Sequence, residues 1–228
     1  MARAITLTLL IALLCLTQNS APQTLPPAKA DGFVYTDTAV DSSTILIEAF
    51  VDPICPDSAD AWDPLKEAVE YYGTRVWLVV HLLPLPYHDN AYVASRALHI
   101  VNQLNASATF PLLELFFKEQ GRFYNAKTFN MSRASVTSYI ADFASRVLGN
   151  SYQSTILAGF RNIQTDLKTR VSFKYSASRA VYGTPFFFVN GFLLSDSESP
   201  TNVSGWKSII DPLIAAQEDT SEKLARSF

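Results

Sequence analysis

Two strongly apolar segments, residues 44–51 (TILIEAFV) and 75–83 (RVWLVVHLL), constrain the fold of this chain more than any other feature. Both have the composition of buried strands. Between them, apolar side chains recur every three or four positions, as on one face of a helix: Ala59, Trp62, Leu65, Val69 and Tyr72. Because two parallel strands need a long crossover connection, this order predicts a parallel βαβ unit. Gly73 ends the predicted helix, and Pro64 is expected to kink it.

The rest of the chain predicts a helical block followed by a hairpin and a final helix. Helical patterns cover residues 90–104, 109–119, 132–148 and 151–169. Asn190-Gly191 then separates two apolar runs, which is a strong hairpin signal. The strands of this hairpin are predicted at 185–189 and 192–195, the closing helix at 206–217 and a short edge strand at 33–36. The predicted class is therefore α/β, with the order βαβ, helical insertion, ββα.

Composition indicates a globular chain and excludes some partners. Hydrophobic residues make up 48% of the 228 residues and charged residues 17%, enough to bury a large core. A net charge of −3 gives no reason to expect a nucleic-acid partner or an anionic membrane surface. Three histidines (His81, His88 and His99) beside a single mature thiol are too few for a structural zinc site, so no metal is expected.

The N-terminus has the pattern of a signal peptide. Arg3 precedes an uncharged apolar run from Ile5 to Leu16, shorter than the about 20 residues that a membrane span needs. A buried N-terminal helix is the alternative, but the proline-rich tract that follows could not continue it. We expect a signal peptide at 1–21, a flexible lead-in at 22–32 and no membrane anchor. The C-terminus carries no retention signal, so a secreted or lumenal location is predicted.

Removal of the signal peptide also removes Cys15 and leaves Cys55 as the only thiol. Cys55 lies where the first strand passes into the helix, and Pro56 suits a first helical turn. The free N–H groups and positive dipole end of a helix favour a thiolate there, although the negative charges of Asp52 and Asp57 oppose it. The alternative is a small buried residue at the end of a strand.

Two motifs in this order resemble the thioredoxin superfamily and, within it, the DsbA-like thiol oxidoreductases. Residues 55–58 (Cys-Pro-Asp-Ser) are similar to the Cys-Pro-x-Cys motif of that family, and Thr184-Pro185 before an apolar strand is similar to its cis-proline loop. The resemblance covers about residues 44–217. It implies a thioredoxin-like fold with a DsbA-like helical subdomain, divided into an N-terminal half (33–89), an inserted helical subdomain (90–182), a C-terminal half (183–218) and a tail (219–228).

The resemblance also implies site residues. Cys55 would be the nucleophile, and Thr184, a cis Pro185 and Pro56 would bind the substrate. Ser58 replaces the second cysteine, so it cannot resolve a mixed disulfide. It would instead donate a hydrogen bond to the thiolate, or be an ordinary first-turn serine.

The predicted function is monothiol exchange in the secretory pathway through mixed disulfides. The partners would be protein clients that carry thiols or disulfides, with no cofactor and with glutathione as an optional co-substrate. A non-catalytic peptide-binding module with the same groove is the main alternative, and a glutathione transferase with a helix-inserted thioredoxin fold is a weaker one. The sequence leaves the client and the oligomeric state open.

Several other residues invite a functional interpretation. His88 lies in a predicted loop where Asp89 or Asn90 would cap the next helix, so a general-base role is the weaker interpretation of it. His81 and the aromatic run 186–188 are expected in the core. Three sequons, at predicted helix ends or loops, would permit N-glycosylation in a eukaryotic host: Asn105, Asn130 and Asn202.

Overall fold

A computed structural model describes residues 27–36, 41, 43–195 and 199–225. The predicted signal peptide lies outside these residues, so the structure says nothing about it. The chain divides into residues 1–30 and a folded unit that begins at Asp31. No helix in the described part of the chain is both long and apolar enough to cross a bilayer.

The folded unit is built on a mixed five-stranded sheet in the order β1-β3-β2-β4-β5. The strands are β1 (Phe33–Val34), β2 (Ile45–Val51), β3 (Val76–Leu82), β4 (Phe186–Val189) and β5 (Phe192–Leu193). β2 and β3 pair in parallel, as the βαβ pattern predicts, whereas β1 is antiparallel to β3 and β4 is antiparallel to β2. The short edge strand and the hairpin are also confirmed.

The helices follow the predicted order. They are α2 (Pro56–Tyr72), α3 (Ala91–Leu104), α4 (Thr109–Glu119), α5 (Asn125–Thr128), α6 (Arg133–Ser145), α7 (Gln153–Gly159), α8 (Ile163–Ser178) and α9 (Val203–Ala225). Short 3-10 turns lie at Gly73–Arg75, Ala106–Ala108, Gln120–Phe123 and Asn150–Tyr152. Pro64 lies inside α2 without ending it.

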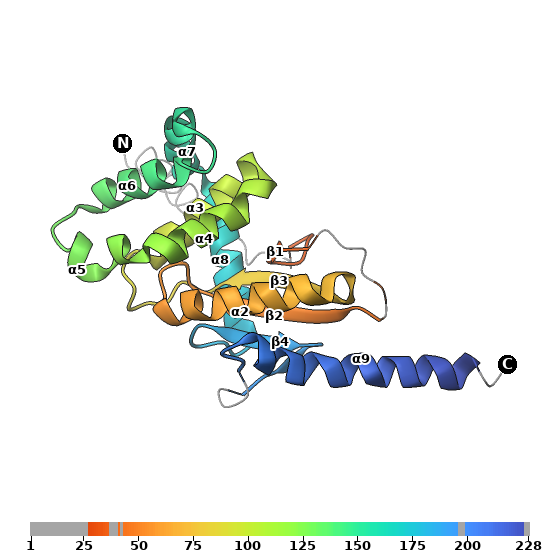
Figure 1. Cartoon of the computed structure of the whole chain (residues 1–228). Coiled ribbons are helices and arrows are strands. Elements are labelled where there is room, and N and C mark those ends of the chain that lie inside the picture. Colours follow the sequence, from red (N-terminus) through yellow and green to blue (C-terminus); the bar gives the residue numbers. More distant parts are fainter. Residues whose placement is uncertain (1–26, 37–40, 42, 196–198, 226–228) are drawn as a thin grey trace, which may run out of the picture. The chain divides into compact units, whose positions relative to one another are not determined.

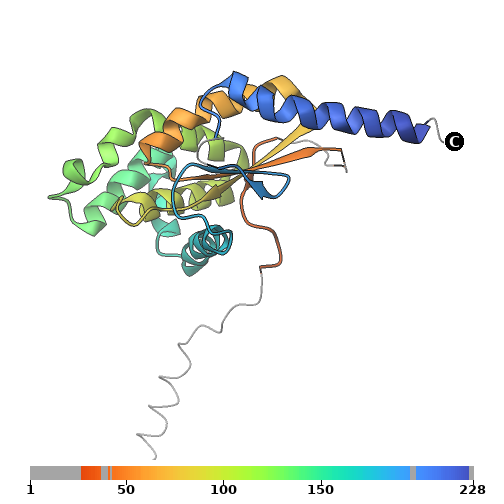
Figure 2. The same ribbon diagram turned by 90° about the horizontal axis from the view of Figure 1, so that it is seen from below.

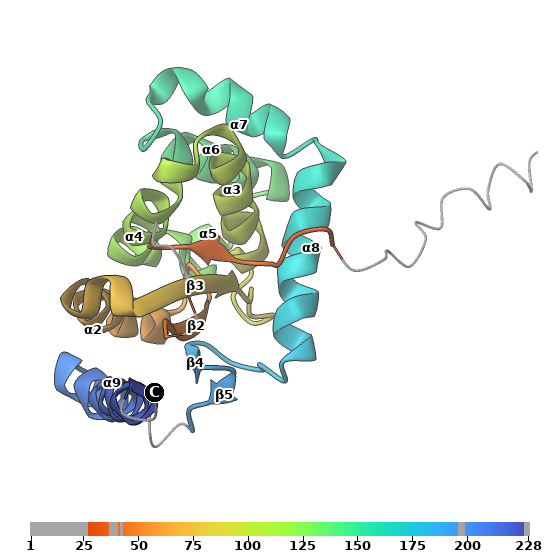
Figure 3. The ribbon, with the colours of Figure 1, turned by 90° about the vertical axis from the view of Figure 1, so that its right-hand side faces the viewer.

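The sheet separates two groups of helices. α2 and α9 lie side by side on one face (Figures 1 and 2), and α8 lies on the other (Figure 3). Trp206 of α9 is fully buried, and its ring meets Phe187 of β4 edge-on at 5.1 Å. The helices α3, α4, α6 and α7 gather beyond the β1 edge, and α3 packs against α8 (Figure 3). The helical insertion therefore has its own core, continuous with that of the sheet.

Several boundaries differ from the sequence prediction; for example, α6 ends at Ser145 and not at 148, and α9 begins at Val203 and not at 206. The helix expected at 151–169 is two helices, α7 and α8, because Asn162 caps a new helix by accepting a hydrogen bond from the Gln164 backbone N–H. The closing helix continues to Ala225, past the predicted end at 217. Asp31 belongs to the folded unit and not to a flexible lead-in, because its carboxylate is bonded to His81 and Ser172.

Candidate active site

Cys55 is the N-cap residue of α2, and it is buried, with 3% of its surface exposed. Its backbone is extended (φ −83°, ψ 124°), and Pro56 occupies the first helical turn. These observations confirm the predicted position of the cysteine. Its side chain packs in a small apolar cluster with Phe50, Leu83, Leu85, Val181, Phe186 and Phe188.

The Cys55 thiol meets the loop that precedes β4. Its Sγ donates a hydrogen bond to the Thr184 carbonyl oxygen at 3.4 Å, and the Thr184–Pro185 bond is cis. The sheet register explains the contact: β2 and β4 run antiparallel with Phe50 opposite Phe186, so the end of β2 lies beside the beginning of β4. The sequence prediction of a cis proline facing Cys55 is confirmed.

The Asp52 carboxylate connects the loop after β2 to the loop after β3 through hydrogen bonds. Its side chain is fully buried, and both carboxylate oxygens are occupied. Oδ1 accepts a hydrogen bond from the Ile54 backbone N–H at 2.9 Å, whereas Oδ2 accepts bonds from the Leu85 N–H at 3.0 Å and from His88 Nδ1 at 2.9 Å. Because β2 and β3 are parallel, the loops after them leave the sheet at the same end, and this brings Asp52 to His88. The sequence indicated Asp52 only as a charge that opposes the thiolate.

His88 lies in a loop before α3, as predicted, with a side chain that is 20% exposed. The hydrogen bond to Asp52 raises the pKa of His88, and it outweighs the opposite effect of partial burial. The prediction that Asp89 or Asn90 caps α3 with its side chain is wrong. Asn90 is at the N-cap position but makes no capping bond, because its amide donates to Phe123 O and Thr128 Oγ1.

Ser58 has a different partner from the predicted one. Its hydroxyl oxygen accepts a hydrogen bond from the Asp52 backbone N–H at 3.3 Å, and among the described contacts it makes no bond to Cys55 Sγ. The side chain is buried, with 1% exposure. Ser58 therefore supports the loop that precedes Cys55 and does not solvate the sulfur.

A pocket of about 330 Å³ is lined by the two neighbours of Cys55 in the chain, Ile54 and Pro56, but not by Cys55 itself. Its other lining residues are Tyr87, His88, Tyr124, Asn125 and Ala126. Burial raises the pKa of both phenols, Tyr87 and Tyr124, and the nearby Cys55 raises them further. Asn125 braces the loop around His88, because its amide donates to Tyr87 O at 2.9 Å and accepts from the Asp89 N–H at 3.0 Å. In the side-chain amide orientation that satisfies both its oxygen and its nitrogen, Gln120 donates a hydrogen bond to Ile54 O at 3.0 Å.

The residues that α5 and the turn before it contribute to this pocket were not predicted. Tyr124, Asn125 and Ala126 lie far along the chain from Cys55, in the helical insertion, and no motif marks them. Of the predicted substrate-binding residues, Pro56 lines the pocket, whereas Thr184 and Pro185 do not. Thr184 contacts the Cys55 sulfur through its backbone carbonyl instead.

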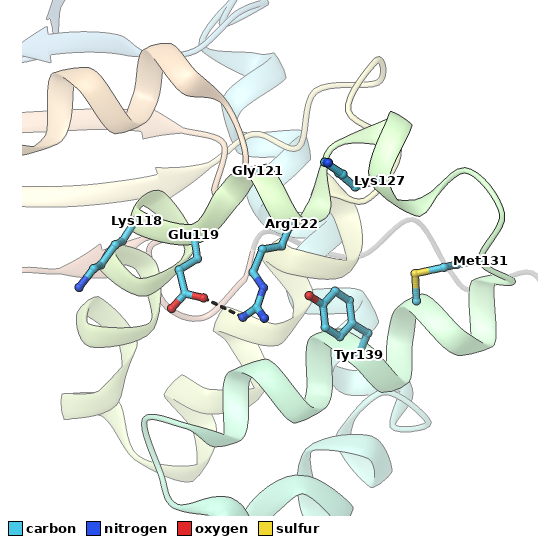
Figure 4. Close-up of a pocket in the computed structure, with 7 residues that line it drawn as sticks. All are labelled: Lys118, Glu119, Gly121, Arg122, Lys127, Met131 and Tyr139. Atoms are coloured by element: carbon cyan, nitrogen blue, oxygen red, sulfur yellow. Dashed lines mark hydrogen bonds and ion pairs between the residues drawn. The ribbon is translucent and has the colours of Figure 1, made fainter.

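A second hollow, of about 810 Å³, is formed by the α4–α6 region (Figure 4). Its lining residues are Lys118, Glu119, Gly121, Arg122, Lys127, Met131 and Tyr139. Glu119 binds Arg122 at 2.7 Å and also Arg146 at 2.7 Å, so much of the charge there is neutralised within the chain. Cys55 and Thr184 do not line this hollow, which is therefore not the site of the thiol.

A buried polar network lies behind the thiol, on the α8 side of the sheet. His81 Nδ1 lies 3.0 Å from Asp31 Oδ2, and Tyr175 donates to Glu48 Oε1 at 2.6 Å. Burial by itself would lower the pKa of His81, but the bond to Asp31 and the nearby Glu48 raise it. The His81 ring, in turn, lowers the pKa of Glu48. Phe50 stacks on His81 at 4.7 Å and separates the network from Cys55, so His81 is a core residue as predicted.

The remaining predicted sites lie on the surface. Asn105, Asn130 and Asn202 are all exposed at helix ends or turns, as expected, and their glycosylation stays a prediction. In the described ranges, no three histidine, cysteine or acidic side chains gather as a metal site would require.

Comparisons with known proteins support the architecture. No family model matches this chain, and no curated protein matches it in sequence. Solved structures do match it. BdbD from Bacillus subtilis in its oxidised form has a TM-score of 0.62 at 12% identity, over 82% of this chain and 100% of its own.

Two further matches carry a functional description in their names. A protein-disulfide isomerase from Novosphingobium aromaticivorans has a TM-score of 0.58 at 18% identity, over 81% of this chain and 99% of its own. The thiol-disulfide oxidoreductase MdbA from Actinomyces oris has a TM-score of 0.57 at 14% identity, over 73% of this chain and 80% of its own. The chain therefore has a DsbA-like thioredoxin fold, with the helical insertion between its two halves.

Proposed function

We propose that this chain is a monothiol thiol-disulfide oxidoreductase of the secretory pathway that acts through Cys55. One observation carries the proposal: the Cys55 sulfur, at the N-terminus of α2, lies 3.4 Å from the backbone carbonyl of Thr184 beside the cis proline. The free N–H groups and the positive dipole end of α2 lie at this residue. An extended substrate that pairs with the loop backbone would be held next to the sulfur.

The reaction needs one cysteine and an external thiol. The Cys55 thiolate attacks a disulfide RS–SR′, forming a Cys55–SR mixed disulfide and releasing R′S⁻. A second thiol then attacks the mixed disulfide, forms the new disulfide with R and returns the Cys55 thiolate. Glutathione is a suitable second thiol. The clients would be proteins with accessible thiols or disulfides, and the secretory location follows from the predicted signal peptide.

The test compares the purified mature protein with the Cys55→Ala variant. The substrate is bis(2-hydroxyethyl) disulfide with glutathione as the second thiol, and intact-mass measurement detects the mixed disulfide. We expect turnover above background and a trapped Cys55 adduct for the wild type alone. Turnover no faster than that of Cys55→Ala, without an adduct, would overturn the proposal.

The low exposure of Cys55, 3%, favours one alternative function, a non-catalytic module that holds extended peptides in the same groove. In that case Cys55 is a packing residue of the apolar cluster. Peptide binding that survives Cys55→Ala unchanged, together with no disulfide exchange, would support the binding module. Conjugation of glutathione to an electrophile would instead indicate a transferase.

A further inference from the structure

His88 lines a pocket together with Ile54 and Pro56, the two neighbours of Cys55 in the chain, and one of its ring nitrogens is uncommitted. Nδ1 is bonded to the buried Asp52 carboxylate at 2.9 Å. Nε2 has no partner within the described parts of the chain, although the ring lines the pocket next to Pro56 and Tyr87. Since a carboxylate can only accept, Nδ1 carries a hydrogen, and the free nitrogen is the one that gains or loses a proton.

The ring does not touch the sulfur. Cys55 Sγ is bonded to Thr184 O, and none of its described hydrogen bonds involves His88. In thiol-disulfide exchange the three sulfurs lie nearly in line, so the departing sulfur is about 4 Å from the attacking one, twice the S–S bond length of about 2.05 Å. A group that serves the departing sulfur therefore has to lie across the pocket from the nucleophile. His88 lines the same pocket as Ile54 and Pro56, the residues on either side of Cys55.

We propose that His88 is a general acid and base for exchange at Cys55, acting on the departing and entering thiols, and that Asp52 is its positioning residue. This inference rests on the function proposed above. The exchange reaction as written above requires only Cys55 and an external thiol, and the inference adds a chemical role for His88 and Asp52.

The proton balance closes over one turnover. Cys55 thiolate attacks RS–SR′, the S–S bond breaks, and the Nε2 hydrogen of imidazolium His88 passes to R′S⁻ to form R′SH. Neutral His88 then takes the proton of the second thiol, R″SH. The resulting thiolate attacks the Cys55–SR bond, releases RS–SR″ and returns both the Cys55 thiolate and the imidazolium.

The charges around the pocket make this proton transfer useful. Asp52 and Asp57 both act on His88, and the same two carboxylates act on Tyr87. A departing thiolate would face these negative charges, which disfavour it. His88 also lines a neighbouring hollow, and the charged and titratable residues that line it with His88 are Asp89, Tyr92 and Arg133. The raised pKa of His88 keeps more of the imidazolium, the acid form, present near neutral pH.

The test uses two neutral disulfides that differ in their leaving group. Bis(2-hydroxyethyl) disulfide releases a basic alkyl thiolate that benefits from an acid, whereas 4,4′-dithiodipyridine releases a product that is stable as the thione. His88→Gln retains a side-chain N–H for Asp52 but cannot transfer a proton. We expect His88→Gln to slow the alkyl disulfide by at least about a hundredfold, the lower edge of what positioned proton transfer contributes. The dithiodipyridine rate should stay within about twofold.

Glu67→Gln, an exposed residue of α2 that lines neither hollow around His88, is the matched control and should leave both rates unchanged. Asp52→Asn provides a second readout, because it should move the alkaline limb of the alkyl-disulfide pH profile to lower pH. An equal effect of His88→Gln on both substrates, or no effect on either, would overturn the role of His88 while leaving the proposed function intact. If the wild type shows no Cys55-dependent reaction with either disulfide, the proposed function itself fails.

Discussion

The sulfur of Cys55 and the carbonyl oxygen of Thr184 lie 3.4 Å apart although 129 positions separate the two residues. The contact depends on the antiparallel pairing of β2 with β4, which places the residues after Phe50 beside those before Phe186. A substrate bound along the Thr184 backbone would meet the thiol without rearrangement of the sheet.

Ser58→Cys should create a dithiol site. Ser58 lies one helical turn after Cys55, and its side chain points toward the loop that Asp52 organises. Incubation with oxidised glutathione should leave the wild type as a glutathione mixed disulfide, whereas the variant should form an intramolecular disulfide between Cys55 and the introduced thiol. Intact mass and thiol counting distinguish the two products. Ser58→Ala is the control, and a variant that keeps the glutathione adduct would contradict the prediction.

Asn125→Ala should loosen the His88 loop without affecting the thiol. The change removes two hydrogen bonds, to Tyr87 O and from the Asp89 N–H. We expect the free energy of unfolding to fall by about 1–2 kcal/mol, at about 1 kcal/mol for each bond. Turnover of the alkyl disulfide should fall while alkylation of Cys55 by iodoacetamide stays unchanged. Asn130→Ala, an exposed residue outside the pocket, should change neither quantity.

Asp31→Asn, near the end of the segment predicted as a flexible lead-in, should lower the free energy of unfolding. The Asp31 carboxylate accepts from Ser172 Oγ at 2.6 Å and lies 3.0 Å from His81 Nδ1, both in buried surroundings. Removing the charge leaves His81 poorly compensated, so we expect a loss of about 2–4 kcal/mol in urea unfolding at pH 7. Lys29→Gln, two residues earlier and exposed, serves as the control. Equal stability of the two variants would show that Asp31 does not anchor the segment.

His99 should make the protein acid-sensitive. Burial lowers its pKa to about 4, whereas the unfolded chain takes up this proton near the ordinary value of 6.5. Its stabilising contribution is therefore complete above about pH 6.5 and is lost as the pH falls toward 4, by at most about 3 kcal/mol. His81 and His88, with raised pKa values, act in the opposite direction.

The measurement is urea unfolding of the wild type and His99→Gln between pH 7.5 and pH 4.5. The wild type should lose more unfolding free energy across this range than the variant does. The comparison removes the contributions of His81 and His88, which are common to both proteins. Parallel curves would contradict the assignment.

Local patterns in the sequence were sufficient for much of the fold. The apolar runs at 44–51 and 75–83 correspond to β2 and β3, and each predicted boundary lies within one residue of the observed one. The helix predicted at 109–119 is α4, with the same first and last residues. Cys55 at the start of α2 and the cis Pro185 also followed from short motifs. These features depend on residues near one another in the chain, so their periodicity and turn chemistry are visible in the sequence.

Other features were decided by tertiary contacts. Asp52 is recognisable in the sequence only as a negative charge, and its pairing with His88 requires two parallel strands that end at the same edge. Tyr124 and Asn125 line the same pocket as Pro56 because the helical insertion folds back toward the start of α2, and Asp31 is anchored by residues on β3 and α8. These contacts join residues that are far apart in the chain. The free energy of such a contact is gained only when the two segments meet in the folded protein, so no local sequence pattern predicts it.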